Sequence, residues 1–216
     1  MITEFSWNHV GILLLAVRWT LLVSLLAFVG GTLAGFVVAL CRTSKSALLR
    51  NITMGYIQVV QGTPVLIVLF LSYYGLSVLG IKLSPMLAAM LAMTIYASAY
   101  LGEIWRGCIE AVPHGQWEAS ESLAMNRWQQ LWYVVLPQAL RLAIPPTVGF
   151  SVQIVKNTSI TSIIGVVELT RAGQLINNAT FQPFIVFLTV AAIYFALCFP
   201  LSSAAKRMER KLHVSR

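Results

Sequence analysis

The sequence has very little charge. Only 10% of its 216 residues are Asp, Glu, Lys or Arg, seven of them acidic, whereas 58% are hydrophobic. A soluble globule of this size needs more polar surface to cover its core. The composition therefore excludes an ordinary soluble domain and indicates an integral membrane protein.

Other features that the sequence lacks reduce the range of possible functions. The chain has no G-x-x-x-x-G-K-[ST] loop to hold nucleotide phosphates, so no cofactor is expected here and any ATP must be bound by another polypeptide. Its three cysteines are all expected near cytoplasmic helix ends, where thiols stay reduced, so they do not indicate disulfides or a metal site. No basic patch is interleaved with aromatics on a soluble face, which argues against nucleic-acid binding.

Five apolar stretches are long enough to cross a bilayer as helices. A hydrocarbon core of about 30 Å takes about 20 helical residues, whereas barrel strands would be shorter and would alternate apolar with polar positions. We therefore expect an all-α membrane protein with five transmembrane helices in a single domain, residues 1–216. The expected spans are roughly Ile12–Leu40, Gly55–Leu79, Leu83–Ile104, Leu142–Val166 and Phe184–Ala205.

The cations predict the orientation of the chain. If the five spans alternate in direction, most of the 15 Lys and Arg residues fall on one side, and an excess of cations marks the cytoplasmic side. The N-terminus is then outside the cell and the C-terminus lies in the cytosol. The cations assigned to the cytoplasmic side are Arg42, Lys45, Arg50, Arg106, Arg127, Arg141, Lys206, Arg207, Arg210, Lys211 and Arg216.

Small and helix-breaking residues mark two places in the first spans. Gly31 and Gly35 have the small-xxx-small spacing that lets helices approach closely in lipid. We favour ordinary packing within one subunit over a dimer seam.

In the second span, Gln61 and Thr63 lie in the run Gln61–Pro64, whose freed backbone groups need protein or water partners. Two interpretations stay open, a kink at a transport pathway or a helix that begins at the interface.

The fourth span carries a polar cluster that includes Gln153, Lys156, Asn157 and Thr158. A lysine near the bilayer centre costs about 3 kcal/mol, so it usually faces the bundle interior and meets a partner. An ammonium beside an amide and hydroxyls suits the carboxylate of a zwitterionic amino acid. The alternative is that Lys156 extends to the outer interface while the hydroxyls bond to their own helix.

Glu103 resembles a second charge inside the membrane. It precedes Arg106 by three residues near the cytoplasmic rim of the third span. An ion pair on one helix face explains it more simply than a substrate contact does.

A polar segment from about 106 to 141 separates the third and fourth spans. Four of the six tryptophans lie on or beside it, which is typical of an element at the headgroup level. Glu118 and Glu121 fall on one face of a short helix, and Ala119, Leu123 and Trp128 supply apolar contact on the other. From the residues alone, docking to a partner and lying on lipid both remain open. We expect Leu136-Pro137 to turn the chain back toward the membrane.

These residues carry a resemblance. Glu118-Ala119, followed by Leu136-Pro137, resembles the EAA loop of ABC importer permeases, which docks into a groove on the cytoplasmic ATPase. Further blocks are similar to the polar amino acid permease subfamily. They are Gln61–Pro64, Tyr100–Ile104, Arg106-Gly107, Gly115–Ala119, Leu136–Ala139, Val155–Ser159 and Glu168–Gly173.

The resemblance implies a multi-pass permease of the bacterial cytoplasmic (inner) membrane that works by alternating access and is not itself an enzyme. It implies as partners two ATPase subunits that bind ATP, a second permease subunit, an external amino-acid-binding protein and the amino acid itself. The implied coupling residues are Glu118, Ala119, Ser120, Leu123, Ala124 and Pro137. The implied pathway residues are Gln61, Thr63, Gln153, Lys156, Asn157 and Thr158.

Two positions depart from the family pattern. Ser120 stands where the family usually has Ala, and Ala124 stands where it usually has Gly. If position 124 needs a left-handed backbone, Ala costs about 1 kcal/mol there. If the helix continues, Ala is the better residue.

Two rival functions are weaker. Gly149-Phe150-Ser151 resembles part of an intramembrane serine protease, but its hydroxyl needs a nearby general base. Lys156, five residues away on the same helix, faces elsewhere, and the three histidines lie outside the expected spans: His9, His114 and His213. A secondary transporter would need internal repeats or more carboxylates inside the membrane.

Overall fold

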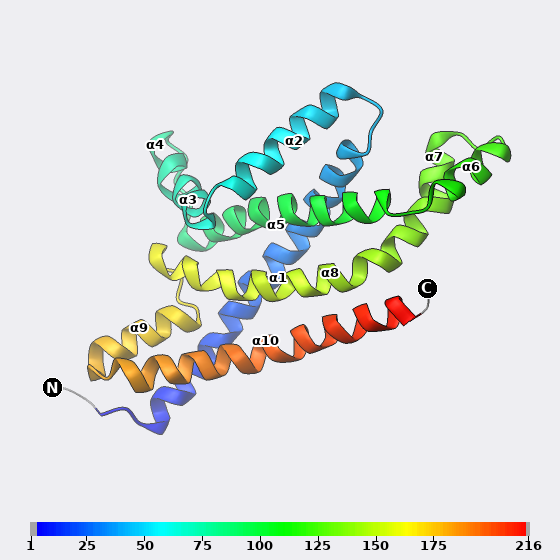
Figure 1. Cartoon of the computed structure of the whole chain (residues 1–216). Helices are drawn as coiled ribbons and strands as arrows, with labels where there is room; N and C mark the ends of the chain where they lie inside the picture. Colours follow the sequence, from blue (N-terminus) through cyan, green and yellow to red (C-terminus); the bar gives the residue numbers. More distant parts are fainter. Residues whose placement is uncertain (1–3, 215–216) are drawn as a thin grey trace.

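All regular structure in the part of the chain that the structure describes, residues 4–214, is helical (Figure 1). The structure is a computed structural model. Arg216 lies outside the described residues, as does the side chain of His213. The elements are α1 Trp7–Arg42, α2 Ala47–Gly62, α3 Val65–Phe70, η1 Leu71–Gly75, α4 Leu76–Val78, α5 Pro85–Glu110, α6 His114–Ser122, α7 Arg127–Gln129, η2 Gln130–Val135, α8 Leu136–Asn157, η3 Thr158–Ile164, α9 Leu169–Thr180 and α10 Pro183–Val214.

The helices are long and apolar enough to cross a membrane in three to five places. Helices α1, α5 and α10 each qualify alone within the described residues. Two further spans are counted only if each of two bent helix pairs is one crossing. The all-helical membrane class is thus confirmed, while the number of five crossings and the orientation of the termini stay predictions.

Helices α1 and α5 pack closely through small residues. A Cβ atom added at Gly31 would lie 2.3 Å from the Cβ of Ala97, and one added at Gly35 would lie 3.1 Å from the backbone nitrogen of Gly102. Only glycine allows the two backbones to come this near. The close contact lies within one chain, so the prediction of packing inside a single subunit is confirmed.

The expected second span, Gly55–Leu79, is broken within the run Gln61–Pro64, as the sequence indicated. The axis turns by 104° between α2 and the α3–α4 segment. Pro64 has no N–H and disfavours a helical backbone at the residue before it. Thr63 accordingly adopts an extended conformation, with φ −110° and ψ 132°.

The expected turn at Leu136-Pro137 is wrong, because the chain is helical without interruption from Arg127 to Ile164. Pro137 is the second residue of α8, which directly follows the π-helical turn η2. The widened turn accommodates the missing N–H of the proline. The side-chain amide of Gln138 donates to the carbonyl oxygen of Val134 at 2.9 Å, which satisfies one freed acceptor.

Beyond η3 the chain bends by 49° into α9. Gly165 sits in the left-handed region with φ 96°, where glycine has no steric penalty. The carboxylate of Glu168 then caps α9, accepting from the backbone N–H groups of Thr170 at 2.9 Å and Arg171 at 2.8 Å.

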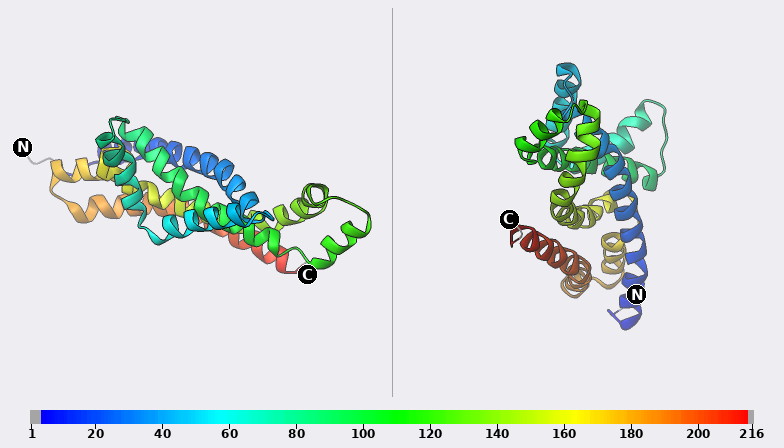
Figure 2. Two further views of the ribbon diagram at one scale, coloured as in Figure 1. Left: turned by 90° about the horizontal axis from the view of Figure 1, so that it is seen from above. Right: turned by 90° about the vertical axis from the view of Figure 1, so that its right-hand side faces the viewer.

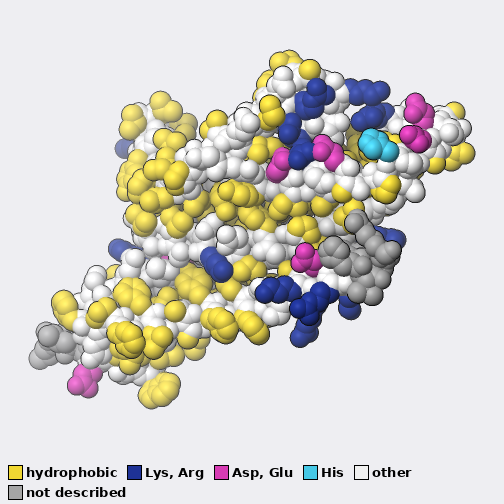
Figure 3. All heavy atoms as spheres, in the orientation of Figure 1, with side chains coloured by type: hydrophobic (Ala, Val, Ile, Leu, Met, Phe, Trp, Pro, Cys, Tyr) yellow, Lys and Arg dark blue, Asp and Glu magenta, His cyan; other side chains and the backbone are white. Residues whose placement is uncertain are grey.

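The bundle is elongated and its two ends differ (Figure 2). Helix α6 and the C-terminus lie at one end, whereas α9 and the N-terminus lie at the other. On the face seen in Figure 3, most Lys and Arg side chains gather toward the end that carries α6. One candidate site, the α6 loop, lies at the charged end of the bundle. The other lies between α8 and α10.

Candidate functional site

Helix α6 and the turn after it project from the charged end of the bundle (Figure 1). Ser120 is buried and its hydroxyl donates to the carbonyl oxygen of Trp117 at 2.8 Å, so this side of α6 faces the bundle. Glu118 and Ala119 lie on the exposed side. The expectation that Ala119, Leu123 and Trp128 supply apolar contact to the bundle is wrong, because all three are exposed, Leu123 to 76% and Trp128 to 63%. The apolar face of the loop is therefore open to a partner.

The turn that ends α6 requires a left-handed residue, and Ala124 provides it with φ 56°. The Ala124 N–H donates to the Glu121 carbonyl at 2.8 Å, and the Met125 N–H donates to the Ser120 carbonyl at 3.3 Å. This pair of bonds is the Schellman arrangement, which glycine usually completes. The first of the two alternatives for position 124 is therefore correct.

An Ala124→Gly variant is expected to stabilise this turn by about 1 kcal/mol, because glycine has no left-handed penalty. The measurement is amide hydrogen exchange of the α6 segment, with slower exchange expected at Met125. The control is Ala119→Gly, which places glycine at an exposed position inside the helix and should have the opposite effect of about 1 kcal/mol. Faster exchange in Ala124→Gly would contradict the assignment.

The last turns of α5 hold an ion-pair network just before the loop. The guanidinium of Arg106 binds Glu103, with Nη2 to Oε1 at 2.6 Å and Nε to Oε2 at 3.0 Å. Arg106 also pairs with Glu110 one turn later. The predicted structural role of Glu103 is confirmed, since its carboxylate is engaged by its own helix.

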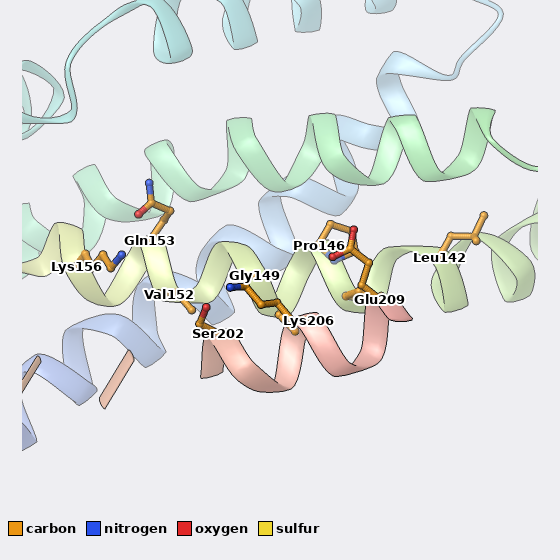
Figure 4. Close-up of a pocket in the computed structure, with 11 residues that line it drawn as sticks. Leu142, Pro146, Gly149, Val152, Gln153, Lys156, Ser202, Lys206 and Glu209 are labelled. Carbon is orange, nitrogen blue, oxygen red and sulfur yellow. The ribbon is translucent and has the colours of Figure 1, made fainter. Parts of the chain in front are cut away.

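A cavity of about 530 Å³ lies between α8 and α10 (Figure 4). Gln153 and Lys156 line it from α8, and both are exposed in the single chain. From α10 it is lined by Ser202, Lys206 and Glu209. Within residues 4–214 neither lysine forms an ion pair. The cavity therefore offers two free ammonium groups, an amide and a carboxylate, which match the charged ends of a small zwitterion.

The other four residues assigned to the pathway line none of this cavity. Gln61 Nε2 donates to the Ala99 carbonyl of α5 at 3.3 Å, and the Thr63 hydroxyl donates to the Val59 carbonyl at 2.7 Å. Thr158 is buried and bonds to its own helix. The Asn157 side chain interacts with Tyr96. In this conformation only Gln153 and Lys156 come together.

Sequence reasoning missed the residues of α10. Ser202, Lys206 and Glu209 recur at helical spacing after an apolar run, which was the signal that could have placed them on one face. It also missed the burial of Glu168, which is fully buried and accepts from the Tyr194 hydroxyl at 2.8 Å.

The candidate nucleophile Ser151 donates to the Val148 carbonyl of its own helix at 2.7 Å, so it is not activated by a base here.

An apolar helical bundle with an exposed loop at its charged end and a polar cavity between helices defines a membrane transport component. Residues 31–214 match the family described as "Binding-protein-dependent transport system inner membrane component". The chain belongs to this family, which comprises the permeases of ABC importers.

Curated relatives are similar over almost the whole chain. A probable amino-acid ABC transporter permease protein of Bacillus subtilis (strain 168), YckA, is 34% identical, covering 92% of each chain. The L-cystine transport system permease protein TcyB of the same organism is 35% identical over 91% of this chain and 84% of its own. The glutamine transport system permease protein GlnP of Escherichia coli (strain K12) is 31% identical over 96% of each.

Solved structures agree with the fold. The crystal structure of an amino acid ABC transporter with histidines matches at a TM-score of 0.89 and 32% identity, covering 98% of this chain and 100% of that chain. An inward-facing MetNI methionine ABC transporter matches at a TM-score of 0.80, covering 96% and 99%. Its identity is 18%, so this second likeness concerns the fold alone.

Proposed function

We propose that this chain is the membrane-spanning permease subunit of an ATP-driven, binding-protein-dependent importer of polar amino acids in the bacterial cytoplasmic membrane. The single observation that carries the proposal is the loop of α6, which turns an exposed acidic and apolar surface away from the bundle. The amino acid permeases among the relatives support the substrate class. The N-terminus lies outside and the C-terminus in the cytosol, in keeping with the gathered cations.

The proposed importer contains further subunits. Two ATPase subunits bind ATP and dock on the exposed surface of α6. A second permease subunit, a copy or a relative, covers the side on which Gln153 and Lys156 are exposed. An external binding protein delivers the amino acid. The ammonium of Lys156 holds its carboxylate, and the amide of Gln153 orients it.

Transport proceeds by alternating access. Closure of the ATPase pair on ATP draws the two α6 loops together, and the bundles rock so that the site opens outward. Hydrolysis then returns the site toward the cytosol. Because α7, η2 and α8 form one continuous helical run, displacement of the loop is transmitted directly to the helix that carries Lys156.

A Glu118→Lys variant tests the docking role. Glu118 is exposed and does not line the cavity behind α6, so charge reversal leaves the fold intact but repels the partner groove. We expect uptake into proteoliposomes to fall at least tenfold and the ATPase subunits to copurify poorly. Glu121→Lys is the comparison on the same helix: because Glu121 lines that cavity, this variant should copurify with the ATPase subunits more fully than Glu118→Lys. Full uptake and full copurification in Glu118→Lys would refute the docking surface.

A further inference from the structure

A second cavity lies at the charged end, separate from the one that contains Lys156. Its volume is about 930 Å³. It is open to one side and is lined by residues from the end of α1, the start of α2, the end of α5, α6 and the start of the α7–η2 run. The function proposed above assigns it no role.

Four cations line this cavity. They are Arg42, Lys45, Arg50 and Arg127. Among residues 4–214 the ion pairs within 4 Å both involve Arg106, so none of the four forms a direct ion pair, although Arg42 lies near enough to Glu103 to interact with its charge. Of the two acidic residues in the lining, Glu110 is already paired with Arg106, which leaves Glu121 alone. The cavity therefore has a marked excess of positive charge.

The arginines are also short of hydrogen-bond partners. Arg42 Nη1 reaches the Arg50 carbonyl only at 3.4 Å, and Arg50 Nη1 reaches the Ser44 carbonyl only at 3.5 Å. The Nε atom of Arg42 is buried with no partner. Arg127 lies over the Trp117 ring at 5.0 Å from its centroid. Guanidinium groups in this state favour an oxyanion that can accept several N–H bonds at once.

The rest of the lining is mixed, and part of it is apolar. Leu40, Ile109 and Leu131 face the cavity beside the cations. On the helix α2 that contributes Arg50, Leu48 and Ile52 are 70% and 60% exposed, so an apolar surface follows the cations at the start of α2. Tryptophan at the rim, Trp128, is typical of the headgroup level. The cavity thus combines an excess of cations with apolar side chains, beside an exposed apolar surface on α2.

We propose that this cavity binds one anionic phospholipid of the inner leaflet. Its phosphate lies among Arg42, Arg50 and Lys45, and its acyl chains leave along Leu48 and Ile52. Basic pockets between helices at the cytoplasmic surface are known to suit such head groups. The lipid joins the α1–α2 turn to the inner side of α6, so it braces the loop that the ATPase moves. The inference depends on this end facing the cytosol, not on which solute is carried.

The test is lipid retention by the full permease complex. The complex is purified in detergent and titrated with phosphatidylglycerol or phosphatidylcholine, and bound lipid is counted by native mass spectrometry. We expect tight retention of phosphatidylglycerol alone. An Arg42→Gln/Arg50→Gln variant should weaken it by about 30-fold. Arg210→Gln/Lys211→Gln, which removes the same charge from an exposed part of α10, should leave it unchanged.

Two single variants keep the test decisive if the double variant does not fold. Lys45→Gln removes an exposed lysine of the α1–α2 turn and should weaken retention about fivefold. Glu121→Gln removes the unpaired acid of the lining and should strengthen it. Wild-type retention in Lys45→Gln, or equal retention of both lipids, would overturn the proposal. Displacement of the lipid by millimolar inorganic phosphate would assign the cavity to a soluble phosphate instead.

Discussion

A Gly31→Leu variant is expected to yield almost no folded protein. A Cβ atom at position 31 would lie 2.3 Å from the Cβ of Ala97 and 3.2 Å from its backbone carbon, so α1 and α5 must separate along their whole contact. Overpacking costs about 1–3 kcal/mol where side chains can adjust, and more where backbone is the obstacle. That is a large part of the few kcal/mol by which proteins are stable. The measurement is the yield of monodisperse protein in mild detergent.

The same helix offers a matched control. Gly11 has no atom within 4 Å of the position its Cβ would take, so Gly11→Leu should give the normal yield. The milder Gly31→Ala should also destabilise, and adding Ala97→Gly should restore part of the loss by removing the closest contact. Normal yield of Gly31→Leu, or no rescue in the double variant, would mean that α1 and α5 do not pack in this way.

A Lys156→Met variant is expected to lose amino acid uptake while the basal ATPase activity of the assembled complex remains. Removal of the ammonium leaves the substrate carboxylate without its charge-assisted bond, and the KM for uptake should rise at least tenfold. Misfolding is not an adequate explanation of such a loss, because replacing a lysine with methionine lowers the cost of inserting α8 in the membrane. The measurement is uptake into proteoliposomes together with ATP hydrolysis.

Lys82→Met supplies the comparison for this result. Lys82 is also exposed, but it lies in the turn before α5 and outside the α8–α10 cavity. Uptake by Lys82→Met should therefore match that of the unmodified protein. An unchanged KM in Lys156→Met would mean that this lysine only extends to the membrane surface.

The sequence predicted best where one local rule decides the structure. The pairing of Glu103 with Arg106 and the close approach at Gly31 follow from helical spacing, and both are present. The all-helical class follows from the length of the apolar runs. The 104° bend at Gly62–Pro64 was visible as a break, but its angle depends on packing against α5, which no local pattern contains.

Prediction was poorer where distant segments meet. The cavity around Lys156 needs α10, and the residues of α10 were not recognised, because its pairing with α8 is set by tertiary packing. Trp128 does not lie on the face that helical spacing predicts, because α6 ends at Ser122 and the left-handed Ala124 redirects the chain before Trp128. The helical Leu136-Pro137 was missed for a related reason, since a proline normally ends a helix unless a wider turn precedes it.

That wider turn also determines how the α6 loop is aimed. A π turn contains one residue more than an α turn, and each residue of an α-helix rotates the chain by about 100°. The segment before Gln130, which includes α6 and α7, is therefore rotated about the α8 axis by roughly that angle, compared with an uninterrupted α-helix. The direction in which the loop meets its neighbour is thus set by one additional residue in the π turn against which α6 packs.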